Sequence, residues 1–170
     1  MPKSGIESER GWIQRRLIQP LLNLLRGGLT PADLGRSLAA GTVFACFPIL
    51  GTTTLLCAFA APLLRLNPVA IQVANYAAYP LQFALLLPFY SAGNRLFGLP
   101  PIELSTEALI DTFQKDFWAA TRFFAGTGLR GVLVWGILSI PTYWALARIY
   151  GIALRSLWDR INKVQTPSDS

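Results

Sequence analysis

The stretch SLAAGTVFACFPILGTTTLLCAFAAPLL (residues 37–64) is followed, after a single arginine, by LNPVAIQVANYAAYPLQFALLLPFYSAGN (residues 66–94). Between Arg36 and Glu103 the chain has no acidic residue, and only Arg65 and Arg95 are charged. About 20 apolar residues in a helix are enough to cross the core of a bilayer. The two runs therefore predict an all-α integral membrane protein.

The composition points the same way. Of 170 residues, 52% are hydrophobic and 14% are charged, and the mean hydropathy is +0.41, which is high for a soluble domain of this size. The net charge is +6, but the basic residues lie mainly near the chain ends, where they suit anionic lipid headgroups. We therefore expect membrane lipids as partners and no nucleic acid.

Nothing in the sequence indicates a metal or a cofactor. The chain has no histidine, and its two cysteines, Cys46 and Cys57, are too far apart for a CxxC motif. Each lies in the first apolar run, where a thiol behaves as a small hydrophobic group. We expect neither a disulfide nor a metal site.

The first apolar run is interrupted near its middle. Thr30 and Pro31 have the residue types of an N-cap and a first helical position, which predicts a helix from there to Cys46. Phe47-Pro48 then breaks this helix, and a second one is expected over about Thr52–Leu64. At 1.5 Å per residue neither arm reaches the ~30 Å needed to cross a bilayer core. The pair is either one kinked span or a re-entrant hairpin.

The second run has a similar interruption. Pro68 can open its helix, Tyr79-Pro80 breaks it, and Gly98 follows its end. Phe44–Ile49 and Tyr76–Leu81 match class by class at an offset of 32 residues. This similarity is either an internal repeat or a coincidence between two apolar segments.

Three further helices are predicted. Residues 11–26 and 105–125 have apolar residues at helical spacing beside charged faces, which predicts amphipathic helices at the membrane surface; the first could equally pack on the rest of the protein. After a break at Gly126–Gly131, residues 132–154 form a third span. The chain divides into an N-terminal tail with its interfacial helix (1–28), a membrane domain (29–98), an amphipathic connecting helix (99–130), a transmembrane helix (131–155) and a C-terminal tail (156–170).

Topology follows from the basic residues. Six Lys and Arg lie up to Arg36 and four from Arg148 onward, whereas residues 96–131 carry three against four acids. Both termini are therefore expected in the cytoplasm. Three full crossings would place them on opposite sides, so one broken run is re-entrant. We choose the first run, because Gly51 suits a tight turn.

The breaks are also where we expect a binding site. Backbone exposed at membrane depth must be satisfied by protein or by a water-lined cavity, and unpaired N–H groups at the start of a half-helix favour an anionic ligand. Alternatively, the threonines cap the second arm and the asparagine bonds a neighbouring helix. The candidate substrate-binding residues are Pro48, Gly51, Thr52, Thr53, Thr54, Asn75, Pro80, Arg65 and Arg95.

Three motifs, Phe47–Thr54, Arg65-Leu66-Asn67 and Asn75–Pro80, make residues 29–98 resemble the bacterial membrane family known as domain of unknown function 2062. Here Tyr76 replaces the family's proline after asparagine, and Ala78 stands where threonine is usual, which weakens transfer of a role to the third motif. The resemblance implies a small protein of the bacterial inner membrane with no established activity. Some relatives are joined to glycosyltransferase domains, which implies an envelope glycosyltransferase-type partner.

Two functions remain open. The first is facilitated transport or translocation of an anionic solute or a phosphate-bearing lipid, with Arg65 and Arg95 holding phosphate at the interfaces. Since neither run contains a carboxylate or a histidine, we expect no proton relay. The second is a non-catalytic scaffold or accessory subunit for envelope enzymes. No enzyme motif occurs, so we expect no catalytic activity, and a homo-oligomer is expected because so few spans barely enclose a pathway.

Overall fold

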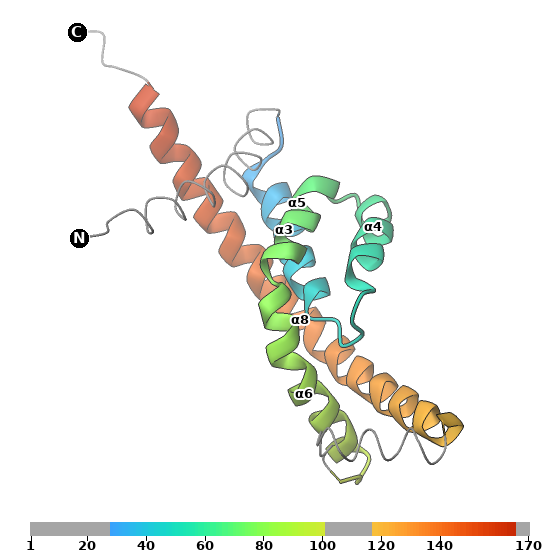
Figure 1. The fold of residues 1–170 in the computed structure, drawn as a ribbon. Coiled ribbons are helices and arrows are strands. Elements are labelled where there is room, and N and C mark those ends of the chain that lie inside the picture. The colour runs from blue at the N-terminus through green and yellow to red at the C-terminus, as the bar shows by residue number, and fades with distance from the viewer. Residues whose placement is uncertain (1–27, 101–116, 166–170) are drawn as a thin grey trace, which may run out of the picture.

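The computed structural model describes residues 28–100 and 117–165, which contain helices and no strand. The all-α fold class is thus confirmed for this part of the chain. The amphipathic helix expected over residues 11–26, and most of the one expected over 105–125, lie outside the described residues. The helices are α3 (Pro31–Ala45), α4 (Thr53–Leu63), α5 (Pro68–Ala77), α6 (Tyr79–Leu96) and α8 (Phe117–Gln165) (Figure 1).

Both predicted helix starts are confirmed. The Thr30 hydroxyl oxygen accepts a hydrogen bond from the backbone N–H of Asp33 at 3.1 Å, and Pro31 is the first residue of α3. Hydrogen bonds from Thr30 and Arg36 stabilise the Asp33 carboxylate and lower its pKa. At α5 the side chain of Asn67 caps two backbone N–H groups, and Pro68 follows it. A proline at this position lacks only an N–H that has no partner inside the helix.

Helices α3 and α4 form an antiparallel hairpin (Figure 1). After the C-cap of α3 at Cys46, residues 47–52 reverse the chain, with Gly51 at φ +81°. A side chain at this φ would be strained, so the turn requires glycine. Helix α3 is the centre of the fold, because it packs against α4, α5 and α8.

The second break has a different result from the first. Helix α5 ends at Ala77 and α6 begins at Tyr79, and both the Leu81 and Gln82 N–H groups bond to the Ala78 carbonyl. Pro80 lies in the first turn of α6, where its missing N–H costs no hydrogen bond. The chain therefore keeps its direction, and α5 and α6 follow each other end to end (Figure 1).

The two similar segments have one structural feature in common, the end of a helix. Phe44–Ile49 and Tyr76–Leu81 each contain the end of a helix, at Ala45 and at Ala77, which are matching positions. The chain reverses after the first and continues after the second. The similarity marks two helix ends rather than two equivalent structural units.

The predicted break at Gly126–Gly131 is wrong, because helix α8 runs without interruption from Phe117 to Gln165. It also continues past residue 155, where the sequence suggested the end of a span. The glycines serve close packing instead. A Cβ on Gly131 would lie 2.7 Å from the Tyr90 ring, and one on Gly93 of α6 would lie 2.7 Å from the backbone of Arg130. Helix packing here offsets a glycine's weak helix propensity of about 1 kcal/mol.

Small residues also bring α3 close to its neighbours. A Cβ on Gly41 would lie 2.2 Å from the Ile71 carbonyl oxygen, and one on Gly35 would lie 2.7 Å from the Gly151 nitrogen. The core around these crossings consists of two buried clusters, Leu34, Leu38, Ala70 and Ala74, and Ala40, Cys57, Ala61 and Ile71. Close backbone approach through glycine and alanine is common in membrane helix packing.

The surface of the described residues carries many large apolar side chains. On α4, Phe59 is 76% exposed and Leu63 is 82% exposed. Within the described part of the chain, one helical stretch, Ala125–Arg160 of α8, is long and apolar enough to cross a membrane, and its most apolar window is not buried. Helix α4 is apolar but shorter.

Candidate functional site at the tip of the α3–α4 hairpin

The tip of the hairpin is held by side chains from α6 and α8. Gln82 donates its amide N–H to the Phe47 carbonyl at 2.8 Å, and the Tyr90 hydroxyl donates to the Pro48 carbonyl at 2.6 Å. From α8, the Trp135 indole N–H donates to the carbonyl of Val43 at 3.1 Å. The Phe47 and Pro48 carbonyls lie beyond the end of α3, where a helix leaves acceptors without partners of its own. The Val43 carbonyl lies in the last turn of α3 and also accepts from the Cys46 N–H at 3.2 Å.

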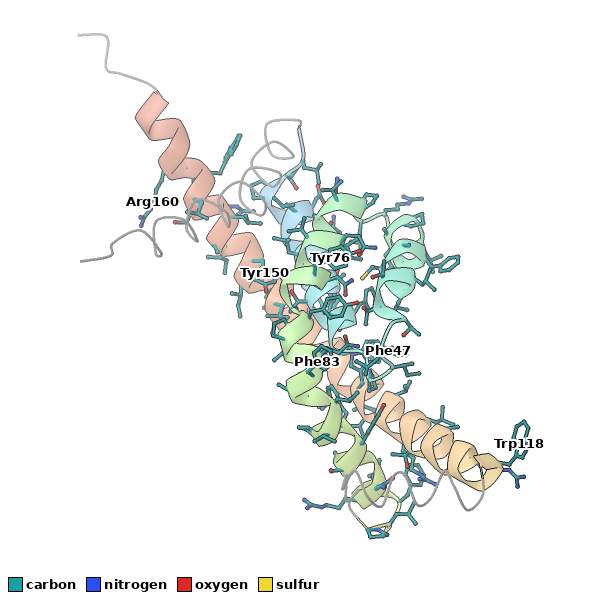
Figure 2. The ribbon with its side chains drawn as sticks, in the orientation of Figure 1. Phe47, Tyr76, Phe83, Trp118, Tyr150 and Arg160 are labelled. Carbon is teal, nitrogen blue, oxygen red and sulfur yellow. The ribbon has the colours of Figure 1, made fainter. Side chains whose placement is uncertain are left out.

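The ring of Phe47 contacts the Trp135 ring edge to face, with 4.9 Å between the ring centroids. Figure 2 shows Phe47 at the tip, beside α6 and α8. Aromatic pairs of this geometry add about 0.5–1.5 kcal/mol beyond area burial. The tip is therefore a packed turn with defined partners.

A second set of amides lies along the face of α5 toward the start of α4. The Gln72 amide N–H donates to the Thr54 carbonyl at 3.1 Å, and the Asn75 amide N–H donates to the Gln72 side-chain oxygen at 3.3 Å. A carbonyl can only accept, so the Thr54 contact fixes which end of Gln72 faces it. The Asn75 side-chain oxygen Oδ1 consequently has no hydrogen-bond donor.

Three buried polar atoms around the hairpin have no protein partner: Thr53 Oγ1, Asn75 Oδ1 and Gln82 Oε1. Their residues are 0%, 0% and 1% exposed. Leaving a buried polar group unpaired costs about 1–3 kcal/mol. Such groups concentrate here on three consecutive helices, α4, α5 and α6, and they mark the candidate site.

The structure brings together four of the residues that the sequence singled out. Pro48, Thr53, Thr54 and Asn75 all belong to the hairpin or to the amides that face it. Thr54 takes part through its backbone carbonyl, not its hydroxyl.

Thr52 and Gly51 have other roles. Thr52 is the N-cap residue of α4, but its hydroxyl bonds to the Ile49 carbonyl at 2.9 Å and caps no N–H group. Gly51 is exposed and supplies the turn. The alternative that these threonines cap α4 is therefore wrong for the Thr52 side chain.

Three predicted residues lie apart from the tip. Pro80 is exposed in the first turn of α6. Arg65 is exposed just beyond α4, and Arg95 is exposed in the last turn of α6, and these two helix ends lie at opposite ends of the bundle (Figure 1). Arg65 has φ +54°, which is rare for a residue with a side chain.

Sequence reasoning missed Gln72, Gln82 and Tyr90. A usable signal was present, because positions 72, 75 and 82 fall on one side of a helical projection and carry three of the five amide side chains in residues 66–94. The prolines drew attention to the breaks, whereas the contacts that hold the breaks come from these amides and the tyrosine.

Comparison with known proteins places the chain in a family. Uncharacterised proteins conserved in bacteria, grouped as DUF2062, match it over residues 14–158, well beyond the range on which the sequence resemblance rested. The chain belongs to the DUF2062 family. Neither a curated protein nor a solved structure matches it.

An apolar groove of about 290 Å³ adjoins the tip in this DUF2062 member. Its lining hydroxyls bond to carbonyls of their own helices, Thr42 to Leu38 and Ser139 to Gly136, so they leave the groove apolar. The groove lies between α3, α6 and α8 and is lined by Thr42, Val43, Cys46, Leu81, Leu85, Phe89, Trp135, Leu138, Ser139, Thr142 and Leu146.

Proposed function

We propose that the chain is an integral protein of the bacterial inner membrane, with α5–α6 and α8 crossing the bilayer and α3–α4 forming a re-entrant hairpin. At 1.5 Å per residue α5–α6 rises about 43 Å, whereas α3 and α4 rise about 22 Å and about 16 Å. Only the first length exceeds a bilayer core of about 30 Å. Two crossings leave both termini on the cytoplasmic side.

The apolar surface supports a membrane location. A soluble protein rarely exposes apolar patches larger than a few hundred Å², yet α8 alone exposes Leu133, Ile137 and Ile140 along its apolar stretch. A core helix of a soluble protein would be buried, and a signal sequence would lie near the N-terminus. The Ala125–Arg160 stretch is far from the N-terminus, and its most apolar window is not buried.

We further propose that the protein facilitates the passage of a phosphate-bearing lipid across this membrane. The observation that carries this proposal is the set of buried, unpartnered polar atoms around the hairpin, Thr53 Oγ1, Asn75 Oδ1 and Gln82 Oε1, which in this arrangement lie within the membrane. Interrupted helices with exposed polar groups at membrane depth are characteristic of transporter binding sites. The adjoining apolar groove favours a lipid over a free anionic solute, since it can accept an acyl chain.

The arginines suit the two ends of such a path. Arg65 and Arg95 lie at opposite ends of the bundle, and each is exposed. In the proposed topology they face opposite interfaces, where a guanidinium group binds a lipid phosphate. No charged residue occurs between them in the sequence, which supports passage without proton coupling.

A reconstitution experiment tests this function. The purified chain is placed in liposomes that contain phosphatidylglycerol with a fluorescent acyl chain, and external dithionite bleaches the label. Bleaching should stop at the outer leaflet in protein-free liposomes and continue to the inner leaflet with the protein. Equal bleaching in both preparations would refute lipid translocation.

One observation favours the second candidate, a non-catalytic scaffold for an envelope enzyme such as a glycosyltransferase. Leu55, Phe59 and Leu63 form an exposed stripe along α4, at i, i+4 and i+8. A partner helix could pack there. Under this alternative, Phe59→Ala should reduce crosslinking to the partner, whereas Asn75→Leu should leave it unchanged. The translocation function predicts that Asn75→Leu slows lipid passage and that Phe59→Ala does not.

A further inference from the structure

The orientation of the amides at the hairpin determines what chemistry they can bind. The Phe47 carbonyl accepts from Gln82 Nε2, so Gln82 Oε1 is the atom without a partner. The Thr54 carbonyl fixes Gln72 in the same way, and Gln72 in turn makes Asn75 present its N–H, leaving Asn75 Oδ1 unpartnered. Turning either amide around would set two acceptors against each other.

We propose that the hairpin binds the hydrogen-bond-donating part of a lipid headgroup, a hydroxyl or an ammonium group, through Asn75 Oδ1 and Gln82 Oε1. This inference rests on the proposed function and names the class of lipid. Both oxygens are acceptors in a buried site, and their residues are at most 1% exposed. They are complementary to a donor and unfavourable to an anion.

The two parts of the headgroup meet different groups of the protein. Arg65 and Arg95 are positioned for the phosphate, at the ends of the bundle, whereas the amides at the hairpin have no charged residue beside them in the sequence. The phosphate is therefore recognised at the interfaces, and the alcohol or amine esterified to it is recognised at the hairpin.

Two contacts in succession are available to a moving headgroup. Asn75 lies near the end of α5 and Gln82 near the start of α6, seven residues further along the chain and beyond the helix break at Ala78. The Thr53 hydroxyl, also buried without a partner, can either donate or accept and adds a third contact from α4.

A headgroup series in the same liposomes tests the inference on the wild-type protein. Phosphatidylglycerol offers hydroxyl donors and phosphatidylethanolamine an ammonium donor, whereas phosphatidylcholine and phosphatidylmethanol offer none. All four carry a phosphate and the same labelled acyl chains. We expect the two donor lipids to cross about tenfold faster, the effect of one hydrogen bond to a buried acceptor. Equal rates for all four would overturn the inference and leave the translocation function standing.

Variants localise the effect. Asn75→Leu and Gln82→Met should each remove most of the preference for donor lipids. Thr127→Val is the matched control, because Thr127 of α8 is also buried without a partner but lies outside the hairpin and its amides, and it should keep the preference. A preference that survives both amide substitutions would show that the oxygens bind only water.

Lipid binding separates the two proposals. Copurification of each lipid with the protein from mixed micelles measures recognition without transport. Selective retention of the donor lipids with no translocation would refute the proposed function and support the inference. No selectivity in either assay would refute the inference.

Discussion

Thr53 is the residue at which stability and function are most clearly opposed. Its hydroxyl is fully buried and has no partner, so it destabilises the fold unless a ligand or water bonds to it. Thr53→Val keeps the shape and removes the unpaired group. We expect the free energy of unfolding of this variant to be about 1 kcal/mol higher than that of the wild type. We also expect it to translocate lipid more slowly.

Thermal unfolding in detergent, followed by circular dichroism, measures the first effect and the dithionite assay the second. Thr127→Val should stabilise the protein similarly and leave translocation unchanged. If Thr53→Val destabilised the protein, the hydroxyl would have a structural partner, and its place in the candidate site would be lost.

Arg65 offers a second residue-scale test. The N–H groups of Leu66 and Arg65 bond to the Ala61 and Pro62 carbonyls, which is a Schellman motif with Arg65 in the left-handed position. The end of α6 makes the same motif with Gly98 in that position. Arg65→Gly should therefore stabilise the protein by about 1 kcal/mol, as measured by thermal unfolding.

The reciprocal variant Gly98→Arg should destabilise the protein by a similar amount. If Arg65 binds phosphate as proposed, Arg65→Gly should also slow translocation despite its higher stability. A destabilised Arg65→Gly protein would mean that the arginine side chain makes structural contacts that outweigh its backbone strain.

At this scale the sequence predicted what depends on local chemistry. Thr30 and Asn67 are flanked by proline on the helix side, and both helices begin there. The contacts of Gln82 and Tyr90 with the hairpin tip were not predictable in the same way, because they join residues 35 and 42 positions apart and depend on how α6 packs.

At the scale of elements, the crossing of α3 and α5 depends on Gly41. A Cβ there would lie 2.2 Å from the Ile71 carbonyl oxygen, and backbone cannot move aside as a flexible side chain can. Gly41→Ala should therefore destabilise the protein by about 1–3 kcal/mol. Gly136→Ala is the control, because a Cβ at Gly136 of α8 has nothing within 4 Å.

The control should leave the thermal midpoint unchanged or raise it, since alanine favours a helix more than glycine does. Equal midpoints for Gly41→Ala and the wild type would mean that α3 and α5 can move apart without loss of stability. The close crossing of these helices would then not stabilise the fold.

Tyr90 connects α6 to the hairpin tip. Tyr90→Phe removes the hydroxyl that donates to the Pro48 carbonyl at 2.6 Å and leaves that carbonyl without this donor. We expect a loss of about 1–2 kcal/mol in the free energy of unfolding. We also expect a cysteine at position 50, on the exposed part of the tip, to react faster with a thiol reagent.

Tyr76→Phe is a suitable control, because Tyr76 is exposed on α5. It should change neither quantity. A Tyr90→Phe protein with unaltered reactivity at position 50 would indicate that Gln82 and Trp135 hold the tip without help from the tyrosine.

The glycines of α8 illustrate why element boundaries were harder to predict than element types. The run Gly126–Gly131 reads as a break by helix propensity alone. Gly131 instead accommodates the Tyr90 ring, and Arg130 donates to the Asn94 side-chain oxygen at 3.3 Å. Tertiary packing against α6 overrides the local preference, and no local pattern reveals which glycines have such a neighbour.

For the whole molecule, the proposed topology can be tested with single cysteines at positions 50, 65, 100 and 160 after replacement of Cys46 and Cys57 by alanine. All four positions are exposed. Two crossings and a re-entrant hairpin place 65 and 160 on the cytoplasmic side and 100 on the outer side. A membrane-impermeant maleimide, applied to intact cells and to inverted vesicles, should label them in that pattern.

Position 50 distinguishes the environments of the tip. Polar backbone at membrane depth cannot face lipid, so a tip within the bilayer must be bordered by protein or water. We expect a cysteine there to react from one side, more slowly than position 65, and bound phosphatidylglycerol to slow it further if the headgroup occupies the hairpin. Labelling of 65 and 100 from the same side would exclude α5–α6 as a crossing. A position 50 that reacts as fast as 65 would place the tip outside the membrane, so the buried polar atoms would no longer lie on a path across it.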